Sequence, residues 1–562
     1  MLNITKNKFY LSSALSLFLL SANTQLIAAT FSVNNNDDIS DINPGDGVCE
    51  TNITNGICTF RAALDETNAL NGADIINLPA DTFTIQTSAS YSNNSGSFFI
   101  ADEVDIIGQS ASTTIIDANN LDRAMVVLTP GIVNISNVTL KNGNVGASGV
   151  GGGLAAGNSS LQLTISNSVI QSNQAGTGGG LGTGSPVQSI TLENCLIENN
   201  IGIETPDRTS WGGGISFSTG LLTISKTTIR NNISSFGGGL TTIGDIVLLE
   251  SSVIENTSTL TENVNNGYGG GGLQIGSGSA GSLISINSTI SGNKAYTSGA
   301  GLLVVNGTVH LYNTTITNNT ADSNNDLTGY GGGVIASNSQ PSPNIFLSNT
   351  IIANNNGGQN SPDCSDFNIN ITSQGYNLIG KNTDCNFSAG TGDLIGTAAE
   401  PVEPLLEVLA DNGGSTLTHA LMVGSPAIDA ANPSGCFDNS GNLIVADQRA
   451  GERHVDGGAG SNRCDIGAFE IDYVLKVNAG SNQSVVQGSV VSLDASGSES
   501  SFGIASYTWL QTSGPAITLG DVNSATTNFI APSTASTIRL ELTIVDNNGN
   551  NSQRYSKHSS GK

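Results

Sequence analysis

The side chains that could perform acid–base catalysis are few in this sequence and lie far apart. Hydrolysis of a glycosidic bond needs two carboxyl groups at a defined separation, and elimination beside a uronate carboxylate needs a base with a cation. Asn382-Thr-Asp384 places an amide and a carboxyl group two residues apart, but no Gly-His-Gly, Arg-Ile-Lys or Asp-Asp motif accompanies it within the repeats described below. The histidines are His310, His419, His454 and His558. We therefore assign no catalytic residue, and no cofactor or metal ligand, from the sequence.

Aromatic residues recur beside glycine triplets, and this pattern could serve binding. Trp211, Phe236 and Tyr330 directly precede such a triplet, and Tyr268 lies one place earlier. Flat rings next to glycine can stack on the sugar rings of an extended glycan. The same rings could instead only cover exposed glycine backbone, as edge aromatic residues do in sheets. These four residues are the candidate glycan-stacking residues, with both interpretations open.

A repeat between about residues 130 and 360 must position these side chains. Each copy has an alternating strand, as in Leu222-Thr-Ile-Ser-Lys-Thr-Thr-Ile229, then asparagine, then a glycine triplet and an aliphatic residue. The closing aliphatic residues are 140, 170, 197, 229, 254, 290, 316 and 352, on average about 30 residues apart. That spacing predicts coils stacked about 4.8 Å apart, with an asparagine column that forms a hydrogen-bonded ladder. The expected column is Asn173, Asn199, Asn231, Asn256, Asn293, Asn318 and Asn354.

The pattern of one coil resembles the pectin-lyase-like group. Its two parts, the glycine triplet with an aliphatic residue and the strand end with asparagine, resemble the short repeats of chlamydial polymorphic outer-membrane proteins, which are surface adhesins. The resemblance implies an all-β, right-handed parallel β-helix. It also implies an alternative function, because the β-helix group contains polysaccharide lyases and glycoside hydrolases.

Alignment of the repeats makes predictions about single residues. Cys195 falls in a column of small residues, so we expect a buried side chain and not a nucleophile. The other members of that column are Ser168, Thr227, Ser252, Ser288, Thr314 and Thr350. Glu193 aligns with Glu250, and Glu198 with Glu255, with an unrelated coil between each pair. We interpret these glutamates as a solvated face.

Composition limits the partners. Lys and Arg number 18 against 45 Asp and Glu, so the formal net charge is −27. Nucleic acid and anionic membranes would be repelled by this charge. Charged residues are only 11% of the chain and hydrophobic residues 37%, which is too apolar for a disordered acidic chain.

The first 29 residues are typical of a secretory signal peptide. Two lysines precede the apolar run Leu11 to Leu20, and small residues end the segment at Ala28-Ala29. We expect cleavage after Ala29, export to the extracellular space or a bacterial cell surface, and no transmembrane span in the mature chain. Export permits disulfides, and sequence spacing suggests the pairs Cys49–Cys58, Cys364–Cys385 and Cys436–Cys464, with Cys195 unpaired.

Segments that could cover the open ends of a solenoid flank the repeats. Cys58-Thr-Phe-Arg-Ala-Ala-Leu-Asp-Glu-Thr-Asn68 has helical apolar spacing and resembles the CSLREA-type segment of bacterial surface β-helix proteins. It departs from that motif at Phe60 and Ala62. We interpret Arg61 as a capping residue.

Behind the repeats, three motifs follow in order: Gly424-Ser-Pro-Ala-Ile-Asp-Ala430, Asp447-Gln-Arg449 and Cys464-Asp-Ile-Gly-Ala-Phe-Glu470. This set closely resembles the choice-of-anchor Q domain, a family that follows a β-helix and precedes cell-surface anchoring elements. Its charged residues favour a buried ion network that pins irregular loops. The network residues are Asp429, Asp447, Arg449, Arg453, Asp465 and Glu470.

From Val477 onward, alternating strands recur at regular spacing, which is typical of a β-sandwich. The segment resembles a PKD-like Ig-type domain, with Trp509 as the expected core aromatic residue. The predicted organisation is therefore a signal peptide (1–29), an N-terminal cap (30–80), β-helix repeats (81–400), a choice-of-anchor Q cap (401–471), a PKD-like sandwich (473–550) and a tail (551–562).

The sequence favours a secreted or cell-surface β-helix protein without enzymatic activity. Its expected role is that of an adhesin, or of a scaffold that binds a polysaccharide or a host or cell-surface protein. The alternative is a carbohydrate-active enzyme of pectin-lyase-like fold. Acidic loops are compatible with Ca²⁺, although no loop has EF-hand spacing. Ligand identity, anchoring route and oligomeric state stay open.

Overall fold

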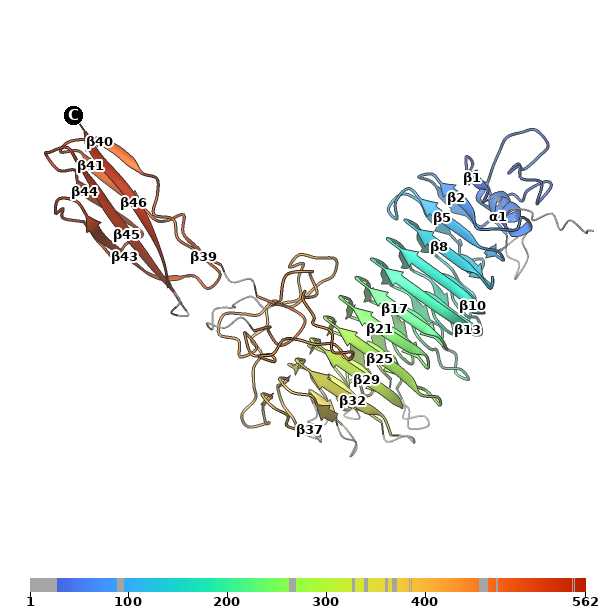
Figure 1. Ribbon diagram of the computed structural model, residues 1–562. Helices are drawn as coiled ribbons and strands as arrows, with labels where there is room; N and C mark the ends of the chain where they lie inside the picture. Colours follow the sequence, from blue (N-terminus) through green and yellow to red (C-terminus); the bar gives the residue numbers. More distant parts are fainter. Residues whose placement is uncertain are drawn as a thin grey trace, which may run out of the picture.

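The computed structural model describes residues 28–87, 96–261, 269–325, 329–337, 342–358, 362–365, 371–383, 385, 387–453, 463–471, 474–547, 549 and 551–561. The predicted signal peptide lies almost entirely outside these residues, as do Tyr268, Asp384 and His454. Over the described ranges the chain forms one helix and 46 strands. Figure 1 shows an elongated stack of coils, with a smaller β-domain beyond it.

The stack is a parallel β-helix, as the repeat predicts. Strands of successive coils pair in parallel register to form four ladders. The front ladder contains β1 (Thr30–Ser32), β2 (Asp74–Leu78), β5 (Val104–Gly108), β8 (Ile132–Ser136), β10 (Leu154–Ser166), β13 (Leu181–Glu193), β17 (Leu221–Ser225), β21 (Asp245–Leu249), β25 (Gly281–Ile286), β29 (Gly307–Tyr312), β32 (Asn344–Ser348), β35 (Ile371–Ser373) and β37 (Phe387–Ser388).

The glycine ladder follows the glycine triplets and contains β4 (Phe98–Ile100), β7 (Met125–Val127), the first residues of β10 and β13, β16 (Ile215–Phe217), β20 (Leu240–Thr242), β24 (Leu273–Ile275), β28 (Leu302–Val304), β31 (Val334–Ala336) and β34 (Cys364–Ser365).

The flank ladder contains β3 (Thr82–Thr84), β6 (Ile115–Asp117), β9 (Thr139–Lys141), β11 (Val169–Gln171), β14 (Leu196–Glu198), β18 (Thr228–Arg230), β22 (Ser252–Ile254), β26 (Thr289–Ser291), β30 (Thr315–Thr317), β33 (Ile351–Ala353), β36 (Leu378–Ile379) and β38 (Leu394–Ile395). The short ladder contains β12 (Gln174–Ala175), β15 (Ile201–Gly202), β19 (Ile233–Ser234), β23 (Thr257–Ser258) and β27 (Lys294–Ala295).

Alternation along each strand places one aliphatic column per ladder inside the stack. In β17, Leu222 and Ile224 are buried, whereas their neighbours face outward. The glycine triplets are needed because backbone passes very close to backbone there. A Cβ on Gly213 would lie 2.5 Å from the carbonyl oxygen of Gly238, and Gly212 has a φ of +63°.

Asparagine has two separate roles in each coil. One set turns the chain with positive φ, for example Asn194 (φ 52°) before the flank ladder and Asn231 (φ 53°) after it. A second set is buried and forms the predicted ladder, in which each side-chain amide donates to the amide oxygen of the next coil at 2.9–3.0 Å. The ladder residues are Asn173, Asn200, Asn232, Asn256, Asn293, Asn319 and Asn355, ending at Asp363.

The expected ladder was therefore wrong at four positions. Asn199, Asn231, Asn318 and Asn354 are the turn residues, and the asparagine that follows each of them is the buried one. Spacing alone does not separate two adjacent asparagines. The positive φ of the first one does, because it directs the second side chain into the coil.

The N-terminal end is closed by α1 (Phe60–Ala69), which confirms the helical spacing. Arg61 is buried, donates to the Gly96 carbonyl at 2.7 Å, and pairs with Asp38 at 2.5 Å. The predicted boundary of the cap at residue 80 needs correction, because β1 and β2 within it already belong to the front ladder.

The described parts of 401–471, residues 401–453 and 463–471, are here called the lateral segment, and they do not lie where the sequence predicts a cap. They pack against the side of coils 250–351, next to β25 and β29 (Figure 1). Thr416 donates to the Glu250 carbonyl, and the Gly467 amide donates to the Asn349 carbonyl, each at 2.9 Å. The lateral segment therefore packs along the side of the β-helix and does not cover its end.

The C-terminal domain is a β-sandwich with Trp509 in its core, as predicted. Its strands are β39 (Leu475–Lys476), β40 (Gln483–Val486), β41 (Val490–Asp494), β42 (Glu499–Ser500), β43 (Ile504–Ser513), β44 (Thr526–Ile530), β45 (Ser536–Asp546) and β46 (Asn551–Gly561). The predicted tail at 551–562 was wrong, because β46 is the strand that joins β40 to β45. The strand was missed because its inward-facing residues, such as Ser556 and His558, are polar and give no alternation of apolar and polar residues.

Candidate functional site

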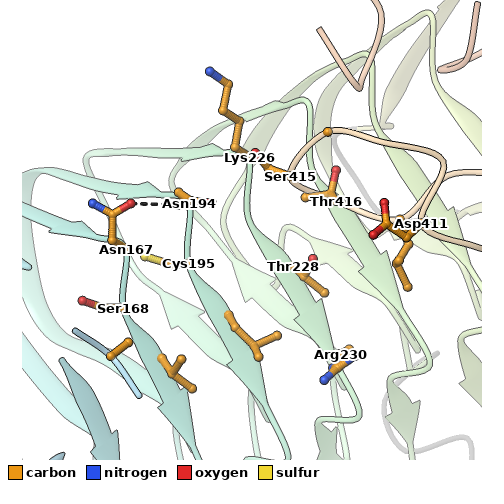
Figure 2. Close-up of a pocket in the computed structure, with 15 residues that line it drawn as sticks. Asn167, Ser168, Asn194, Cys195, Lys226, Thr228, Arg230, Asp411, Ser415 and Thr416 are labelled. Carbon is orange, nitrogen blue, oxygen red and sulfur yellow. Dashed lines mark hydrogen bonds between the residues drawn. The ribbon is translucent and has the colours of Figure 1, made fainter. Parts of the chain in front are cut away.

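A cleft of about 430 Å³ opens where the lateral segment stops covering the flank ladder (Figure 2). We call it the flank cleft. Three successive strands supply its floor, and the loop 411–417 of the lateral segment forms one end. The lining residues are Ala111, Asn167, Ser168, Val169, Asn194, Cys195, Leu196, Lys226, Thr228, Arg230, Asp411, Gly414, Ser415, Thr416 and Leu417.

The lining of the flank cleft is more apolar than polar. Val169, Leu196 and Thr228 are register neighbours on β11, β14 and β18, so their side chains form one outward column. The rim is formed by the positive-φ turn residues Asn167, Asn194 and Lys226, of which Asn194 donates to Asn167 at 2.7 Å. The arrangement offers an apolar strip beside amide and hydroxyl groups.

The two cations at the flank cleft, Arg230 and Lys226, have carboxylate partners. Arg230 contacts Glu198 at 2.8 Å, and Lys226 lies 3.9 Å from Glu250. Burial raises the pKa of Glu250, while Lys226 opposes that shift. Asp411 is the one carboxylate among the lining residues. Such a surface suits an uncharged, hydroxyl-rich ligand better than an anion or a cation.

Cys195 lines the cleft but is buried, with 5% of its surface exposed. Its thiol lies 3.3 Å from the Ile165 carbonyl, and burial raises its pKa to about 11. The thiolate needed for nucleophilic chemistry is therefore scarce at neutral pH.

We expect folded protein to react slowly with iodoacetamide near pH 7.5. Unfolding under non-reducing conditions should expose one thiol per chain, because the other cysteines form Cys49–Cys58, Cys364–Cys385 and Cys436–Cys464. Mass spectrometry of the alkylated chain would report both values. Rapid labelling of the folded protein would show that Cys195 is not held as described.

The aromatic candidates are not in the flank cleft. Trp211 and Phe236 stack with ring centroids 4.3 Å apart, at the edge before the glycine triplets. Phe236 is only 7% exposed, so Trp211 covers it. The aromatic residues before the glycine triplets do not form a continuous row, because Ser298 occupies this position before Gly299. The Ser298 hydroxyl accepts a hydrogen bond from the backbone N–H of Tyr330. Tyr268 lies outside the described residues.

The predicted alignment of Glu193 with Glu250, and of Glu198 with Glu255, was wrong by one residue. Glu193 shares its column with Ser225 and Leu249, and Glu198 shares its column with Arg230 and Ile254. Glu250 and Glu255 instead occupy positive-φ turns. The apolar run 246–249 fits two registers, so the predicted alignment of that coil was shifted by one residue. The same shift placed Ser252 in the small-residue column, where the structure has Ser251.

The charged residues of the lateral segment lie together, as a network. Arg453 is buried and pairs with Glu470 at 3.1 Å, and Arg449 pairs with Asp447 at 2.7 Å. Asp465 accepts the backbone N–H of Asp429 at 2.7 Å, and burial raises the pKa of Asp465.

His419 also joins the lateral segment to the coils. Its Nδ1 donates to the Glu407 carbonyl at 2.7 Å, so Nε2 accepts the Ser291 hydroxyl at 2.9 Å. Burial lowers the pKa of His419, which fits this neutral ring. His310 stacks on Phe346 in the front ladder, and His558 is buried in the sandwich.

Sequence reasoning missed the flank cleft, although a signal for it exists. Outward residues of the flank ladder are long and polar in the early coils, at Lys141, Gln171, Glu198 and Arg230. They become small or apolar where the lateral segment packs, at Ile254, Ser291, Thr317 and Ala353. The cleft lies at this change.

Comparison with known proteins identifies one domain. Residues 479–557 match a family model that describes a PKD domain. No curated protein matches the chain. A solution structure of the PKD domain from KIAA 1837 protein is similar at 24% identity, over 17% of this chain and 97% of that one, with a TM-score of 0.15.

A second solved structure is a nucleoside hydrolase-related hypothetical protein from Saccharophagus degradans, titled as associated with carbohydrate metabolism. It is similar at 29% identity over 17% of this chain and 26% of that one, with a TM-score of 0.15. The strand pairing and the family match together show a parallel β-helix protein that carries a PKD domain at 479–557. Its disulfides and PKD domain indicate an extracellular protein. In the part that the structure describes, no helix is long and apolar enough to cross a membrane.

Proposed function

We propose that this protein is an exported, surface-displayed β-helix scaffold that binds an uncharged polysaccharide in the flank cleft, as an adhesin would. One observation carries the proposal: an outward column of Val169, Leu196 and Thr228 lies beside amide and hydroxyl groups, and the two cations at the cleft already have carboxylate partners. Sugars present apolar C–H faces and polar edges, so they match such a strip.

Features of the sequence support a cell-surface location for the proposed adhesin. The signal-peptide pattern, the CSLREA-like segment at 58–68 and the choice-of-anchor Q resemblance of 401–471 all favour a bacterial cell surface. The pectin-lyase-like resemblance keeps the carbohydrate-active enzyme as the alternative. Asp411, as the one carboxylate lining the flank cleft, supports binding over two-carboxylate hydrolysis there.

The test is retention on immobilised neutral polysaccharides such as xylan, mannan and β-glucan. Asn194→Gly with Leu196→Ser removes one rim amide and part of the apolar floor while keeping the positive φ accessible. We expect retention to weaken on the order of tenfold, because both groups would contact the ligand. Exposed Asn231→Gly with Leu221→Ser is the matched control.

Trp211→Ala separates the cleft from the aromatic edge. Cleft binding predicts that Trp211→Ala retains the ligand as the unsubstituted protein does. Loss of retention with Trp211→Ala, and none with the cleft variant, would move the site to the edge that precedes the glycine triplets.

A further inference from the structure

The sandwich differs from the rest of the molecule in charge. Residues 474–561 carry four Lys or Arg and five Asp or Glu, whereas the whole chain carries 18 and 45. The large acidic excess therefore lies in the preceding residues. Between exposed charges, electrostatic interactions are screened beyond about 8 Å at physiological salt. The sandwich can thus present a local field of its own.

Two of its cations lie side by side on one face. Arg539 on β45 and Lys557 on β46 are direct antiparallel partners, and both side chains are exposed. Like charges directly opposite each other destabilise a sheet. Within the described chain, neither side chain forms an ion pair or a side-chain hydrogen bond.

An aromatic and an apolar side chain lie near the two cations, on either side of Glu541. Two residues along, Glu541 pairs with Tyr555 on one side and with Leu510 on the other. Tyr555 is 62% exposed and Leu510 is 57% exposed. Glu541, directly opposite Tyr555, raises the pKa of the phenol through hydrogen bonding and through its charge.

We propose that this face, made of Arg539, Lys557, Tyr555 and Leu510, binds an acidic polysaccharide. Adjacent unpaired cations would bind carboxylate or sulfate groups, and the exposed Tyr555 ring, two residues from Lys557 on β46, would contact a sugar ring. The site and the ligand charge are separate from those of the flank cleft.

A polysaccharide fits this face better than a membrane does. Juxtamembrane segments that hold anionic lipid use clusters of about four to eight Lys or Arg. This face offers two, and a flat bilayer would also approach the acidic remainder of the chain. A flexible linear polymer can contact the sandwich face alone.

The experiment uses the full chain on immobilised polygalacturonate and dextran sulfate. We expect retention that falls as salt is raised, because the Debye length shrinks from about 30 Å at 0.01 M to about 3 Å at 1 M. Arg539→Gln with Lys557→Gln should weaken retention on the order of tenfold. Lys476→Gln is the matched control, because it removes a sandwich cation that already pairs with Glu499 at 3.6 Å.

Folding of the double variant can be checked directly. Removal of two facing like charges should leave the melting temperature of the sandwich equal or higher. Unchanged retention by a folded double variant would overturn the proposal. Equal losses in the Lys476→Gln control would do the same, and so would binding only to phosphatidylglycerol vesicles. Retention on neutral polysaccharides should not change, which separates this site from the flank cleft.

Discussion

Asn232→Ala should lower the free energy of unfolding by about 4 kcal/mol, one of the two largest effects that we expect. The Asn232 side chain donates to the Ile197 carbonyl and to Asn256 at 3.0 and 2.9 Å. Its oxygen accepts the backbone N–H and the side-chain amide of Asn200 at 3.0 and 2.9 Å. Alanine removes these four bonds and leaves buried groups such as the Asn200 backbone N–H without a partner, and each such group costs about 1–3 kcal/mol.

The adjacent residue provides the control for this experiment. Asn231 is exposed and turns the chain at a φ of 53°, so Asn231→Gly should change stability by less than about 0.5 kcal/mol. Urea denaturation followed by circular dichroism measures both variants. Equal midpoints for Asn232→Ala and Asn231→Gly would show that the ladder does not stabilise the solenoid.

Arg453→Ala should detach the lateral segment from the coils. The guanidinium donates to Asn287 of the solenoid at 2.8 Å, to the Gly467 carbonyl at 2.8 Å, and to Glu470 at 3.1 Å. Glu470 is fully buried, so removal of the arginine takes an ion-pair partner away from a buried carboxylate. Breaking one partner of such a pair costs about 3–5 kcal/mol.

Hydrogen exchange read by mass spectrometry measures this detachment. Amides of 401–471 should exchange faster in Arg453→Ala, while those of early coils such as β5 and β8 stay protected. Arg230→Gln breaks a partly exposed pair with Glu198 and should cost under about 1 kcal/mol. Uniform protection in Arg453→Ala would mean that other contacts suffice to hold the segment.

The coils could be predicted because their signal is repeated. Leu222, Ile224 and Ile229 recur with the same spacing in each coil, so the core columns and the small-residue column of Cys195 follow from alignment. The exact register could not be obtained where the pattern is degenerate. In Ile246-Val-Leu-Leu249 every residue is apolar, and only pairing with Leu222 and Leu283 decides which ones face inward.

The flank cleft could not be predicted, because it depends on a contact between distant segments. The loop that carries Asp411 and Thr416 reaches Glu250 across 166 residues of sequence. An expectation that 401–471 would cover an end placed these residues far from Asn194 and Leu196. The only sequence signal for the packing of the lateral segment is the change from Arg230 to Ile254 and Ser291 in the outward column of the flank ladder.

We propose that this β-helix binds polysaccharide and releases it unchanged. The most direct test incubates the purified protein with neutral and acidic polysaccharides, with and without Ca²⁺, and follows protein retention and polymer length together. We predict retention on at least one neutral polysaccharide with no shortening of the polymer. Shortened or unsaturated sugar products would overturn a purely binding role and support a carbohydrate-active enzyme.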